Sequence, residues 1–381
     1  MPKVCIILPF RNEGDQLVSC LEGLLQFRVP KGVEVTILCM DGGSTDGSKK
    51  IAEKFAELHP NIQNIANLKR YQGCAVNLAV RSFPADNYLW LGAHTRFPAD
   101  YLESCLETKK RTGAEVVGGV CETLPGGDSY GAKVVQAMTT HKFGVGDSGF
   151  RIGAEEGEID TVPYALFAKK AFVDGGYLDE RLVRAQDYEF NRRLARMGMK
   201  IWINPKIRCY YRNQASFWGF LKKQIFLEAP YNSYLWYLAP YAFKWRHAIT
   251  GIFCAGIIGG LLAVAFSHFL GAVFLSIMIL YAGLAIGAGL QQAWRYREWR
   301  HMIVLPVCFF LFHFGHGLGV LRGLACLVTG TAPVQKGREP WPGAGFKRIP
   351  KAWLQTNQGK AVGVGGGPPI DVYDEKGGRE I

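Results

Sequence analysis

The sequence predicts an α/β domain with a mainly parallel sheet, followed by an α-helical membrane region. Three apolar segments of strand length lie in the first hundred residues, at 4–8, 33–40 and 88–91. Apolar residues recur at helical spacing after the first two segments, and strands that alternate with helices indicate βαβ units. Beyond residue 248, long stretches without a single Asp, Glu, Lys or Arg replace this alternation.

Each of the three predicted strands ends in residues that suit ligand binding. These residues are Pro9, Asn12 and Glu13 after the first strand, Asp41 and Gly43 after the second, and Ala93 and His94 after the third. Open α/β sheets bind ligands at the carboxyl ends of their parallel strands. We therefore predict that these loops form one ligand site, although Gly92 stands where the third loop is expected to supply an Asp.

Asp41 opens a glycine-rich turn in which Gly42 and Gly43 let the backbone approach a ligand closely. Its carboxylate suits the N3–H of uracil or a ribose hydroxyl. The alternative is that these residues cap the next helix, a role that Ser44 and Asp46 also suit. We favour ligand binding for Asp41 and capping for Asp46.

Two further groups suit the phosphates of a nucleotide. Lys69, Arg70 and Asn77 surround Gly73 ahead of the third strand, where cations fit a diphosphate and equally fit a solvated turn. His94 suits a divalent metal through an imidazole nitrogen, because Mn²⁺ accepts imidazole beside the hard oxygen ligands that such metals prefer. A structural role for His94 is the open alternative.

Asp187 is the candidate general base. It falls in the first turn of a helix whose apolar stripe contains Phe190 and Leu194. The helix dipole favours a carboxylate in that turn, so a structural cap is the alternative. An ionised carboxylate also suits a base that takes a proton from an attacking hydroxyl group. We expect the neighbouring Glu189 to be solvated.

Three apolar stretches, 249–266, 269–290 and 302–321, predict an integral membrane protein. The first two are about as long as the ~20 residues that a helix needs to cross a bilayer. A third crossing would export a tail rich in Lys and Arg, whereas basic segments prefer the cytoplasmic side. The third stretch therefore either crosses against this preference, or is re-entrant or interfacial.

The charge and the cysteines also favour a membrane protein whose α/β domain lies in the cytoplasm. The formal net charge of +12 suits the anionic inner leaflet better than nucleic acid. Lys3 is followed at once by a strand-like run, so we expect no signal peptide. The ten cysteines are scattered and indicate reduced thiols. We expect a multi-pass protein of the cytoplasmic membrane with its α/β domain on the cytoplasmic side.

We expect four regions along the chain. They are the α/β domain (1–215), an interfacial aromatic and basic segment (216–246), a membrane region with two or three hydrophobic helices (247–328), and a partly disordered polar tail rich in Gly and Pro (329–381). Aromatic residues beside lysines favour the membrane–water interface for the second region, and an aromatic core helix is the alternative. Within the first region, we expect residues 118–151 to be glycine-rich loops around short elements.

Six segments together carry a resemblance to a known family. They are ILPFRNE (7–13), MDGGSTDGS (40–48), AHTRFP (93–98), GVGDSGFR (144–151), DTVPYALF (160–167) and GGYLDERLVRAQDYEFNRRL (175–194). In order and number these segments resemble the family 2 inverting glycosyltransferases of GT-A fold, and among them the membrane-bound enzymes of succinoglycan and exopolysaccharide biosynthesis. The resemblance implies a Rossmann-like, mainly parallel catalytic sheet.

The resemblance also implies roles for the matching residues. Asp41 holds the uracil or ribose of a UDP-sugar, and Asp187 deprotonates the acceptor hydroxyl, which attacks opposite the leaving UDP and inverts the anomeric centre. Pro9, Asn12, Glu13, Gly43, Asn77 and Ala93 complete the nucleotide-sugar site. Arg184, Lys222, Lys223 and Gln224 form a loop at the diphosphate and the acceptor.

Two departures from the family pattern concern the metal. Close relatives read Asp-Ala-His where this chain has Gly92, Ala93 and His94, and they have an acidic residue where this chain has Gln186. The implied cofactor is a divalent metal, Mn²⁺ or Mg²⁺. With its carboxylate replaced by Gly92, the site either holds this metal through His94 alone or functions without it.

The predicted function is transfer of a sugar from a nucleotide sugar, expected to be a UDP-sugar, to a hydroxyl of a lipid-linked or polysaccharide acceptor in exopolysaccharide or cell-envelope glycan synthesis. The expected partners are this donor, a polyprenyl-phosphate-linked glycan or polysaccharide, and membrane lipids, but not nucleic acid. One alternative is a processive polysaccharide synthase, which needs more spans and a Gln-x-x-Arg-Trp motif that this chain lacks. The other is a catalytically degenerate membrane scaffold, which Gly92 and Gln186 favour and which Asp41 and Asp187 oppose.

Overall fold

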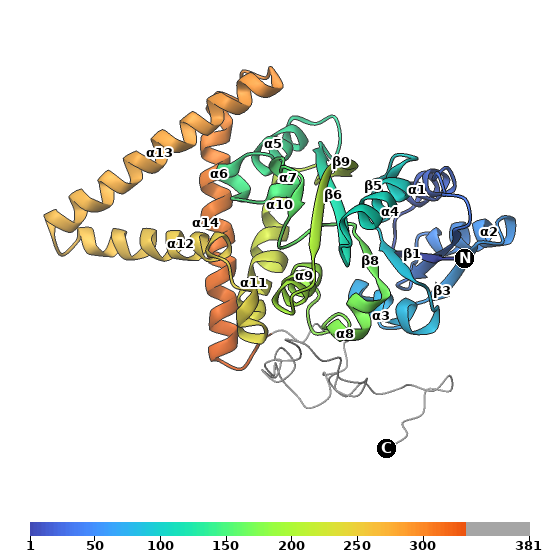
Figure 1. Ribbon diagram of the computed structural model, residues 1–381. Helices are drawn as coiled ribbons and strands as arrows, with labels where there is room; N and C mark the ends of the chain where they lie inside the picture. Colours follow the sequence, from blue (N-terminus) through green and yellow to red (C-terminus); the bar gives the residue numbers. More distant parts are fainter. Residues whose placement is uncertain (333–381) are drawn as a thin grey trace.

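The computed structural model describes residues 1–332 and confirms the predicted fold class. An α/β domain is followed by three long apolar helices (Figure 1). Most of the region predicted as a polar tail, 329–381, lies outside the described residues.

The sheet of the α/β domain has the strand order β3-β2-β1-β4-β8-β6-β9-β5, and β7 pairs with β9. Its strands are β1 (Lys3–Phe10), β2 (Glu34–Asp41), β3 (Ile62–Ala66), β4 (Asn87–Trp90), β5 (Thr95–Arg96), β6 (Val116–Leu124), β7 (Gly157–Glu158), β8 (Leu166–Ala168) and β9 (Ile201–Arg212). Strands β3, β2, β1 and β4 run parallel, and β8 is antiparallel to both β4 and β6. The three strands that the sequence predicts at its start are therefore neighbours, and their loops emerge at one edge.

Helices cover both faces of this sheet. They are α1 (Asp15–Leu25), α2 (Ser48–Leu58), α3 (Gln72–Ser82), α4 (Tyr101–Thr112), α5 (Tyr130–Thr139), α6 (Lys142–Val145), α7 (Gly149–Ile152), α8 (Lys169–Gly175) and α9 (Gln186–Arg196). One core joins α1 and α4 to the sheet through residues such as Leu17 and Leu102. The other joins α3, α8 and α9 through Val76, Phe172 and Phe190. The domain is thus a three-layer α/β structure.

The structure corrects the expectation of loops over residues 118–151. Strand β6 continues to Leu124, and α5 occupies Tyr130–Thr139. A Cβ atom at Gly119 would collide with the carbonyl group of Ile207 on β9, and one at Gly118 would lie 2.8 Å from Cβ of Val162. The glycines therefore permit close approach within the sheet, which is one of the two reasons for glycine in a strand.

The remainder of the described chain is helical. It consists of α10 (Phe217–Lys223), the π-helical turn η1 (Gln224–Glu228), α11 (Ala229–Leu238), the 3₁₀ turn η2 (Pro240–Ala242), α12 (Trp245–Val264), α13 (His268–Tyr296) and α14 (His301–Val328). By length and composition, α12, α13 and α14 are each long and apolar enough to cross a membrane. Within the segment predicted to be interfacial, Tyr231 and Tyr234 are buried while Trp218 and Phe226 are exposed. Its interfacial position stays a prediction.

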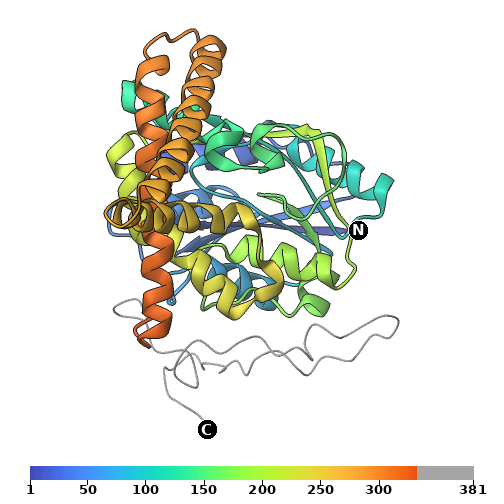
Figure 2. The same cartoon turned by 90° about the vertical axis from the view of Figure 1, so that its left-hand side faces the viewer.

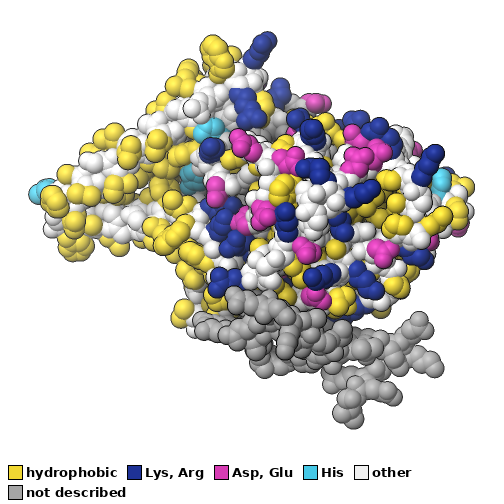
Figure 3. Space-filling model, in the orientation of Figure 1, with side chains coloured by type: hydrophobic (Ala, Val, Ile, Leu, Met, Phe, Trp, Pro, Cys, Tyr) yellow, Lys and Arg dark blue, Asp and Glu magenta, His cyan; other side chains and the backbone are white. Residues whose placement is uncertain are grey.

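Helices α12 and α13 form a hairpin that projects away from the α/β domain (Figures 1 and 2). Hydrophobic side chains cover the hairpin, whereas Lys, Arg, Asp and Glu cover the visible face of the α/β domain (Figure 3). Helix α14 behaves differently, because half of its most apolar stretch is buried inside the protein, against 6% for α13. The hairpin is thus the part of the described chain that offers the largest apolar surface.

Both ends of α14 lie close to the α/β domain, and the first of them contacts it directly. At one end, the Tyr130 hydroxyl of α5 lies 3.2 Å from Nδ1 of His301. At the other end, Leu327 packs on a buried cluster that includes Leu182 and Tyr188. Helix α14 therefore lies along the domain and does not lead away from it.

Candidate active site

The loops after β1 and β2 are joined by hydrogen bonds. The Thr45 backbone N–H donates to Asn12 Oδ1 over 2.8 Å, and the Asn12 backbone N–H donates to Ser44 Oγ over 3.1 Å. The backbone N–H of Glu13 donates to Ser48 Oγ over 3.0 Å. Asn12 has a φ of 57°, a left-handed conformation that Asn adopts more readily than most residues. Asn12 therefore ties the two loops together, whatever further contact it makes with a ligand.

Asp41 is buried at the carboxyl end of β2. Its Oδ1 accepts hydrogen bonds from the backbone N–H and the hydroxyl of Ser44, at 2.9 and 2.7 Å. These bonds orient the carboxylate, and Oδ2 accepts no hydrogen bond from the described residues. Gly43 beside it has a φ of 79°, which favours glycine. One carboxylate oxygen is thus held and the other is free for a ligand.

Asp46 is not the N-cap that the sequence predicts, because Gly47 takes that position without a capping side chain, but its carboxylate binds the first residue of the helix. Its Oδ1 accepts from the backbone N–H and the hydroxyl of Ser48, at 3.0 and 2.7 Å, at the start of α2. These hydrogen bonds from Ser48 hold the pKa of Asp46 below its ordinary value.

The ring of Tyr164 explains the glycine at position 92. A Cβ atom on Gly92 would lie 2.9 Å from Cε1 and 3.4 Å from the hydroxyl of Tyr164. The ring is fixed, because Thr95 Oγ1 donates to the Tyr164 hydroxyl over 2.9 Å and the Tyr101 hydroxyl donates to the Tyr164 carbonyl over 2.8 Å. Tyrosine thus fills the space that the family's carboxylate side chain would need.

His94 offers one nitrogen ligand at this edge of the sheet. Its Nδ1 lies 3.7 Å from Glu13 Oε1, and its ring contacts Tyr211 edge to face with centroids 5.5 Å apart. Within residues 1–332, no group of three or more His, Cys, Asp or Glu side chains is arranged to hold a metal. His94 and Glu13 therefore fit a divalent metal only together with diphosphate oxygens, an arrangement common for Mg²⁺.

The structure shows structural positions for three other predicted site residues, Pro9, Ala93 and Asn77. Pro9 lies in β1 and Ala93 is buried after β4. Asn77 in α3 is buried, with its Nδ2 donating to the Leu178 carbonyl over 2.9 Å and to Glu180 Oε1 over 3.0 Å. Its Oδ1 accepts from the Leu178 backbone N–H over 2.9 Å. Asn77 thus fastens α3 to the segment that leads into α9, and its contact with a donor stays a prediction.

Asp187 lies in the first turn of α9, as the sequence predicts. Its side chain is open to a large cavity, although protein surrounds the carboxylate closely. This burial raises the pKa of Asp187 above its ordinary value, the negative charge of Glu228 adds to the rise, and the positive charge of Arg151 opposes it. A raised pKa brings a carboxylate nearer to the neutral range in which a general base is most effective.

Glu189 is fully buried, so the expectation that it is solvated is wrong. Arg193 donates to its carboxylate from Nη2 over 2.8 Å and from Nε over 2.9 Å, and the Tyr241 hydroxyl donates to it as well. The physical reason is the i, i+4 spacing of Glu189 and Arg193, which allows the two charges to enter the core as a pair. This pair anchors the helix that carries Asp187.

The cavity that Asp187 faces has a volume of about 1320 Å³. It extends from Gly92 and His94 at the sheet edge to Thr250 of α12 and His316 of α14. Its charged lining contains more cations than carboxylates, namely Lys142, Arg151, Arg184, Lys223, Lys244 and Arg246 against Asp147, Asp187 and Glu228. The cavity therefore suits an anionic ligand that reaches from the sheet to the apolar helices.

The predicted diphosphate loop is only partly in this cavity. Arg184, Lys223 and Gln224 line it, whereas the exposed Lys222 does not. Arg184 Nε and Lys223 Nζ lie 3.5 and 3.2 Å from Glu228 Oε1. Gln224 begins the π-helical turn η1, a distortion that often occurs at functional sites.

The structure brings together His94, Asp187 and three members of the loop, but Asp41, Asn12, Gly43 and Asn77 are not in the lining of the cavity. The contact between His94 and Glu13 connects the two groups of residues. Sequence reasoning missed Tyr164, Arg246 and His247, which also line the cavity. Tyr164 lies within the DTVPYALF segment, but nothing in the sequence marks any of the three as facing the site, since each becomes a neighbour of the site only through the fold.

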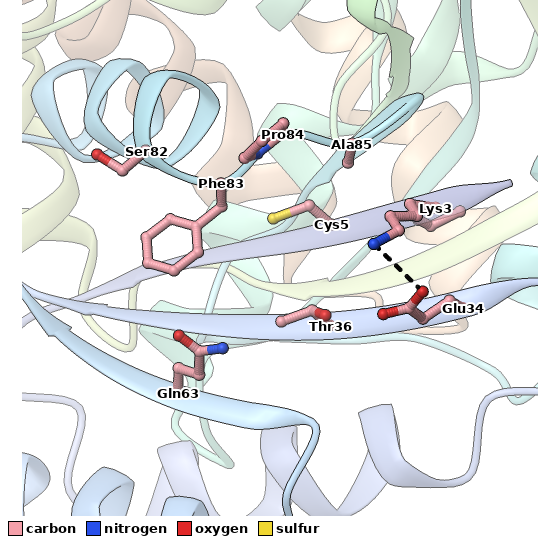
Figure 4. Close-up of a pocket in the computed structure, with 10 residues that line it drawn as sticks. Lys3, Cys5, Glu34, Thr36, Gln63, Ser82, Phe83, Pro84 and Ala85 are labelled. Carbon is pink, nitrogen blue, oxygen red and sulfur yellow. Dashed lines mark ion pairs between the residues drawn. The ribbon is translucent and has the colours of Figure 1, made fainter.

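A smaller hollow of about 150 Å³ lies at the opposite edge of the sheet (Figure 4). Its lining includes Lys3, Glu34 and Phe83, and the Lys3 and Glu34 side chains form an ion pair of 3.5 Å. It contains none of the candidate residues and lies at the amino ends of β1 and β2, away from the edge where α/β sheets bind ligands. It is not part of the candidate site.

Known proteins are similar to this chain in sequence. Residues 5–174 match the protein family described as glycosyl transferase family 2. The succinoglycan biosynthesis protein ExoA of Rhizobium meliloti (strain 1021) is 33% identical over 221 residues, 56% of this chain and 66% of that protein. A dolichyl N-acetyl-alpha-D-glucosaminyl phosphate 3-beta-D-2,3-diacetamido-2,3-dideoxy-beta-D-glucuronosyltransferase of Methanococcus voltae is 27% identical over 337 residues, 84% of this chain and 97% of that protein.

Two solved structures are similar to this chain at low sequence identity. TarS 1–349 of S. aureus, in complex with UDP, has a TM-score of 0.45 at 13% identity and covers 91% of this chain and 97% of its own. The mannosyltransferase PcManGT of Pyrobaculum calidifontis, in complex with GDP-Man and Mn²⁺, has a TM-score of 0.48 at 18% identity and covers 82% and 87%.

Proposed function

We propose that this chain is a glycosyltransferase that transfers a sugar from a UDP-sugar to a hydroxyl group of a lipid-linked glycan at the membrane surface, as the match of residues 5–174 to glycosyl transferase family 2 supports. The observation that carries this proposal is the single cationic cavity that joins Asp187 to the apolar helices. The names of the relatives from R. meliloti and M. voltae describe succinoglycan synthesis and transfer to a sugar on dolichyl phosphate. Both support a glycan acceptor, and the second supports a lipid carrier.

In the proposed reaction, Asp187 takes the proton of the acceptor hydroxyl. The hydroxyl oxygen bonds to the anomeric carbon as the bond from that carbon to the diphosphate breaks, and UDP leaves on the opposite side, so the anomeric centre inverts. Arg184 and Lys223 face the cavity and stabilise the negative charge of the departing diphosphate. The free Oδ2 of Asp41 is placed to accept from the uracil or the ribose of the donor.

His94 and Glu13 would hold a divalent metal, Mn²⁺ or Mg²⁺, together with the diphosphate oxygens, and it would further neutralise the charge of the diphosphate. The protein itself supplies few metal ligands here, because the Tyr164 ring fills the space that a carboxylate side chain at position 92 would need. The cations of the cavity therefore carry more of the task here than they would beside a complete acidic motif.

We place the α/β domain on the cytoplasmic side, with the α12–α13 hairpin in the bilayer. The chain enters and leaves the hairpin at the α/β domain (Figure 1). Helix α14 contacts α5 at one end and packs at the other on a cluster that includes Leu182 and Tyr188 of the α/β domain, which supports a position along the membrane surface without crossing. Two crossing helices are too few to line a channel for a polymer, which favours transfer of single sugars over processive synthesis.

Asp187→Asn tests the proposal in the purified full-length protein. We expect UDP release from the correct UDP-sugar to fall by about 10²–10⁴-fold, the range over which general base catalysis contributes. The matched control is Asp174→Asn, which removes an exposed carboxylate of α8. UDP binding measured by calorimetry shows whether the variant is folded. Full activity of Asp187→Asn would refute the role of Asp187 as general base. Failure of the unmodified protein to bind UDP would favour the alternative of a catalytically degenerate membrane scaffold.

A further inference from the structure

A group of three polar side chains lies where the start of α12 meets the helix that carries Asp187. Tyr188, Arg246 and His247 all line the cavity. The guanidinium carbon of Arg246 lies 5.3 Å from the centre of the Tyr188 ring, and the rings of Tyr188 and His247 meet edge to face with centroids 5.0 Å apart. The three side chains therefore form one continuous surface, which we call the Arg246 cluster.

Two donors of the Arg246 cluster have no acceptor among the described residues. The Tyr188 hydroxyl and His247 Nδ1 are buried and unpaired, and Tyr188 as a whole is only 9% exposed. Arg246 Nε donates to His247 Nε2 over 3.2 Å, so a neutral His247 carries its proton on Nδ1 and donates from there. Burial raises the pKa of Tyr188 to about 12, so its hydroxyl stays protonated at neutral pH.

Buried donors without an acceptor are unfavourable, and native proteins rarely contain them without a reason. Here the missing partner has to supply acceptor atoms on two sides of a guanidinium group. The oxygen atoms of a phosphate meet this requirement, and Arg is well suited to phosphate because its donors match the geometry of the oxygens.

The charges around the cluster agree with an anionic ligand. Arg246 Nη1 donates to Asp147 Oδ1 over 2.8 Å, but the Asp147 side chain is 67% exposed, so the pair is open to solvent. Lys244 lies 4.0 Å from the same carboxylate and pairs more closely with Asp160. An arriving phosphate thus meets two cations beside an exposed carboxylate that can turn toward water.

The walls beyond the cluster indicate that the phosphate is carried by a lipid. Phe253 of α12 and Phe312 of α14 line the next part of the cavity. Their polar neighbours Thr250 and His316 satisfy each other, with Oγ1 and Nδ1 2.8 Å apart. From this point α12 continues into the projecting hairpin, whose surface is apolar (Figure 3). A phosphate at the cluster can therefore keep its hydrocarbon chain beside α12.

We propose that the Arg246 cluster binds the phosphate group of the lipid acceptor. This inference rests on the proposed function, because it assumes that the acceptor is lipid-linked. Tyr188 and Asp187 both belong to the first turn of α9, and both line the cavity. A phosphate bound at Tyr188 consequently holds the sugar that it carries in the same cavity as the base.

Calorimetry with geranyl phosphate, a water-soluble prenyl phosphate, tests the cluster in the full-length protein in detergent. Tyr188→Phe removes one hydroxyl and Arg246→Gln removes the cation. We expect Tyr188→Phe to weaken binding on the order of tenfold, the value of one hydrogen bond to a charged group, and Arg246→Gln to weaken it more. Lys54→Gln is the matched control, because it removes an exposed cation of α2 that does not line the cavity. It should leave the affinity unchanged.

Two competitors identify what the site recognises. We expect inorganic phosphate and geraniol each to bind at least about tenfold more weakly than geranyl phosphate, since each lacks half of the ligand. If inorganic phosphate binds as tightly as geranyl phosphate, the site does not recognise the lipid chain. If geraniol binds as tightly, the site does not recognise the phosphate group. Unchanged affinity of the folded Tyr188→Phe and Arg246→Gln proteins would overturn the cluster itself.

Kinetics separate a failure of this inference from a failure of the proposed function. With a prenyl-phosphate-linked sugar as acceptor, Tyr188→Phe should raise the acceptor KM about tenfold and leave kcat within about twofold, as expected for lost uniform binding. An unchanged KM in a variant that still uses this acceptor would refute the cluster alone. A wild-type protein that transfers sugar only to lipid-free glycans would refute the proposed acceptor.

Discussion

Gly92 and Tyr164 are a matched pair of residues, and their coupling is measurable. Gly92→Asp places a Cβ atom 2.9 Å from the Tyr164 ring. Overpacking of this kind lowers stability by about 1–3 kcal/mol. We expect a fall of a few degrees in the thermal unfolding midpoint of the full-length protein in detergent.

The double variant provides the control for this pair. Tyr164 has a φ of 49°, so Tyr164→Gly both clears the space and suits the backbone. In the Tyr164→Gly background, Gly92→Asp should lower the free energy of unfolding by less than it does in the unmodified protein. Equal costs in the two backgrounds would show that the ring is not what excludes the side chain.

The pH dependence of the reaction reports on Asp187. Burial raises its pKa and Glu228 adds to the rise, so Asp187 takes up a proton at a higher pH than an ordinary Asp, whose pKa is about 3.9. A protonated Asp187 cannot act as a base, and kcat/KM should fall as the pH drops through this raised pKa. Glu228→Gln removes a negative charge, lowers the pKa of Asp187 and should move the acid limb to lower pH.

The pH–rate profile of kcat/KM checks this shift, with Glu57→Gln on the distant helix α2 as the control. An acid limb that stays in place or moves to higher pH in Glu228→Gln would contradict the assignment of Asp187 as the titrating base.

Single residues could be predicted where a motif places them at a strand or helix end. Asp41 and Asp187 lie where the sequence puts them, at the end of β2 and in the first turn of α9. Tyr188 and His247 could not be paired in this way, because they are far apart in the chain and meet only in the folded protein. The burial of Glu189 could not be predicted either. Its pairing with Arg193 allows both charges to enter the core, and the polar sequence of α9 gives no sign of this.

At the scale of elements, apolar strands were easier to predict than glycine-containing ones. β1, β2 and β4 begin and end within a few residues of the predicted segments. β6 was missed because its two glycines suggest a loop, while their actual role is close packing on Val162 and Ile207. The strands β5 and β7 have two residues each and carry too little pattern for prediction.

Glycine has the same packing role in α14. Cβ atoms at Gly319 and Gly323 would lie 2.6 and 2.7 Å from the carbonyl oxygens of Ile225 and Pro230, and one at Gly317 would collide with the carbonyl of Thr250. Small residues thus let α14 pack closely on η1, α11 and α12. Its apolar composition predicts a membrane span, but these contacts show that much of the apolar surface is used inside the protein.

At the scale of the whole molecule, the packing of α14 supports the topology that we propose. Its first turn contacts α5 at Tyr130, and its last turn packs on a cluster in which α11 meets Leu182 and Tyr188 of the α/β domain. A crossing helix would hold these ends on opposite faces of the bilayer, which is incompatible with contact to one domain. The 20 residues of α12 give a length of about 30 Å, which matches the hydrocarbon core, so the hairpin can cross and return.

We therefore expect His268 at the hairpin tip and Thr331 after α14 to lie on opposite sides of the membrane. Nine of the ten cysteines are buried and Cys326 is partly buried, so a Cys326→Ser background should react little with a membrane-impermeant maleimide. In that background, His268→Cys should react in right-side-out vesicles and Thr331→Cys only in inverted ones. Reaction of Thr331→Cys in right-side-out vesicles would mean that α14 crosses. The basic residues that follow it would then lie outside, against the preference of Lys and Arg for the cytoplasmic side.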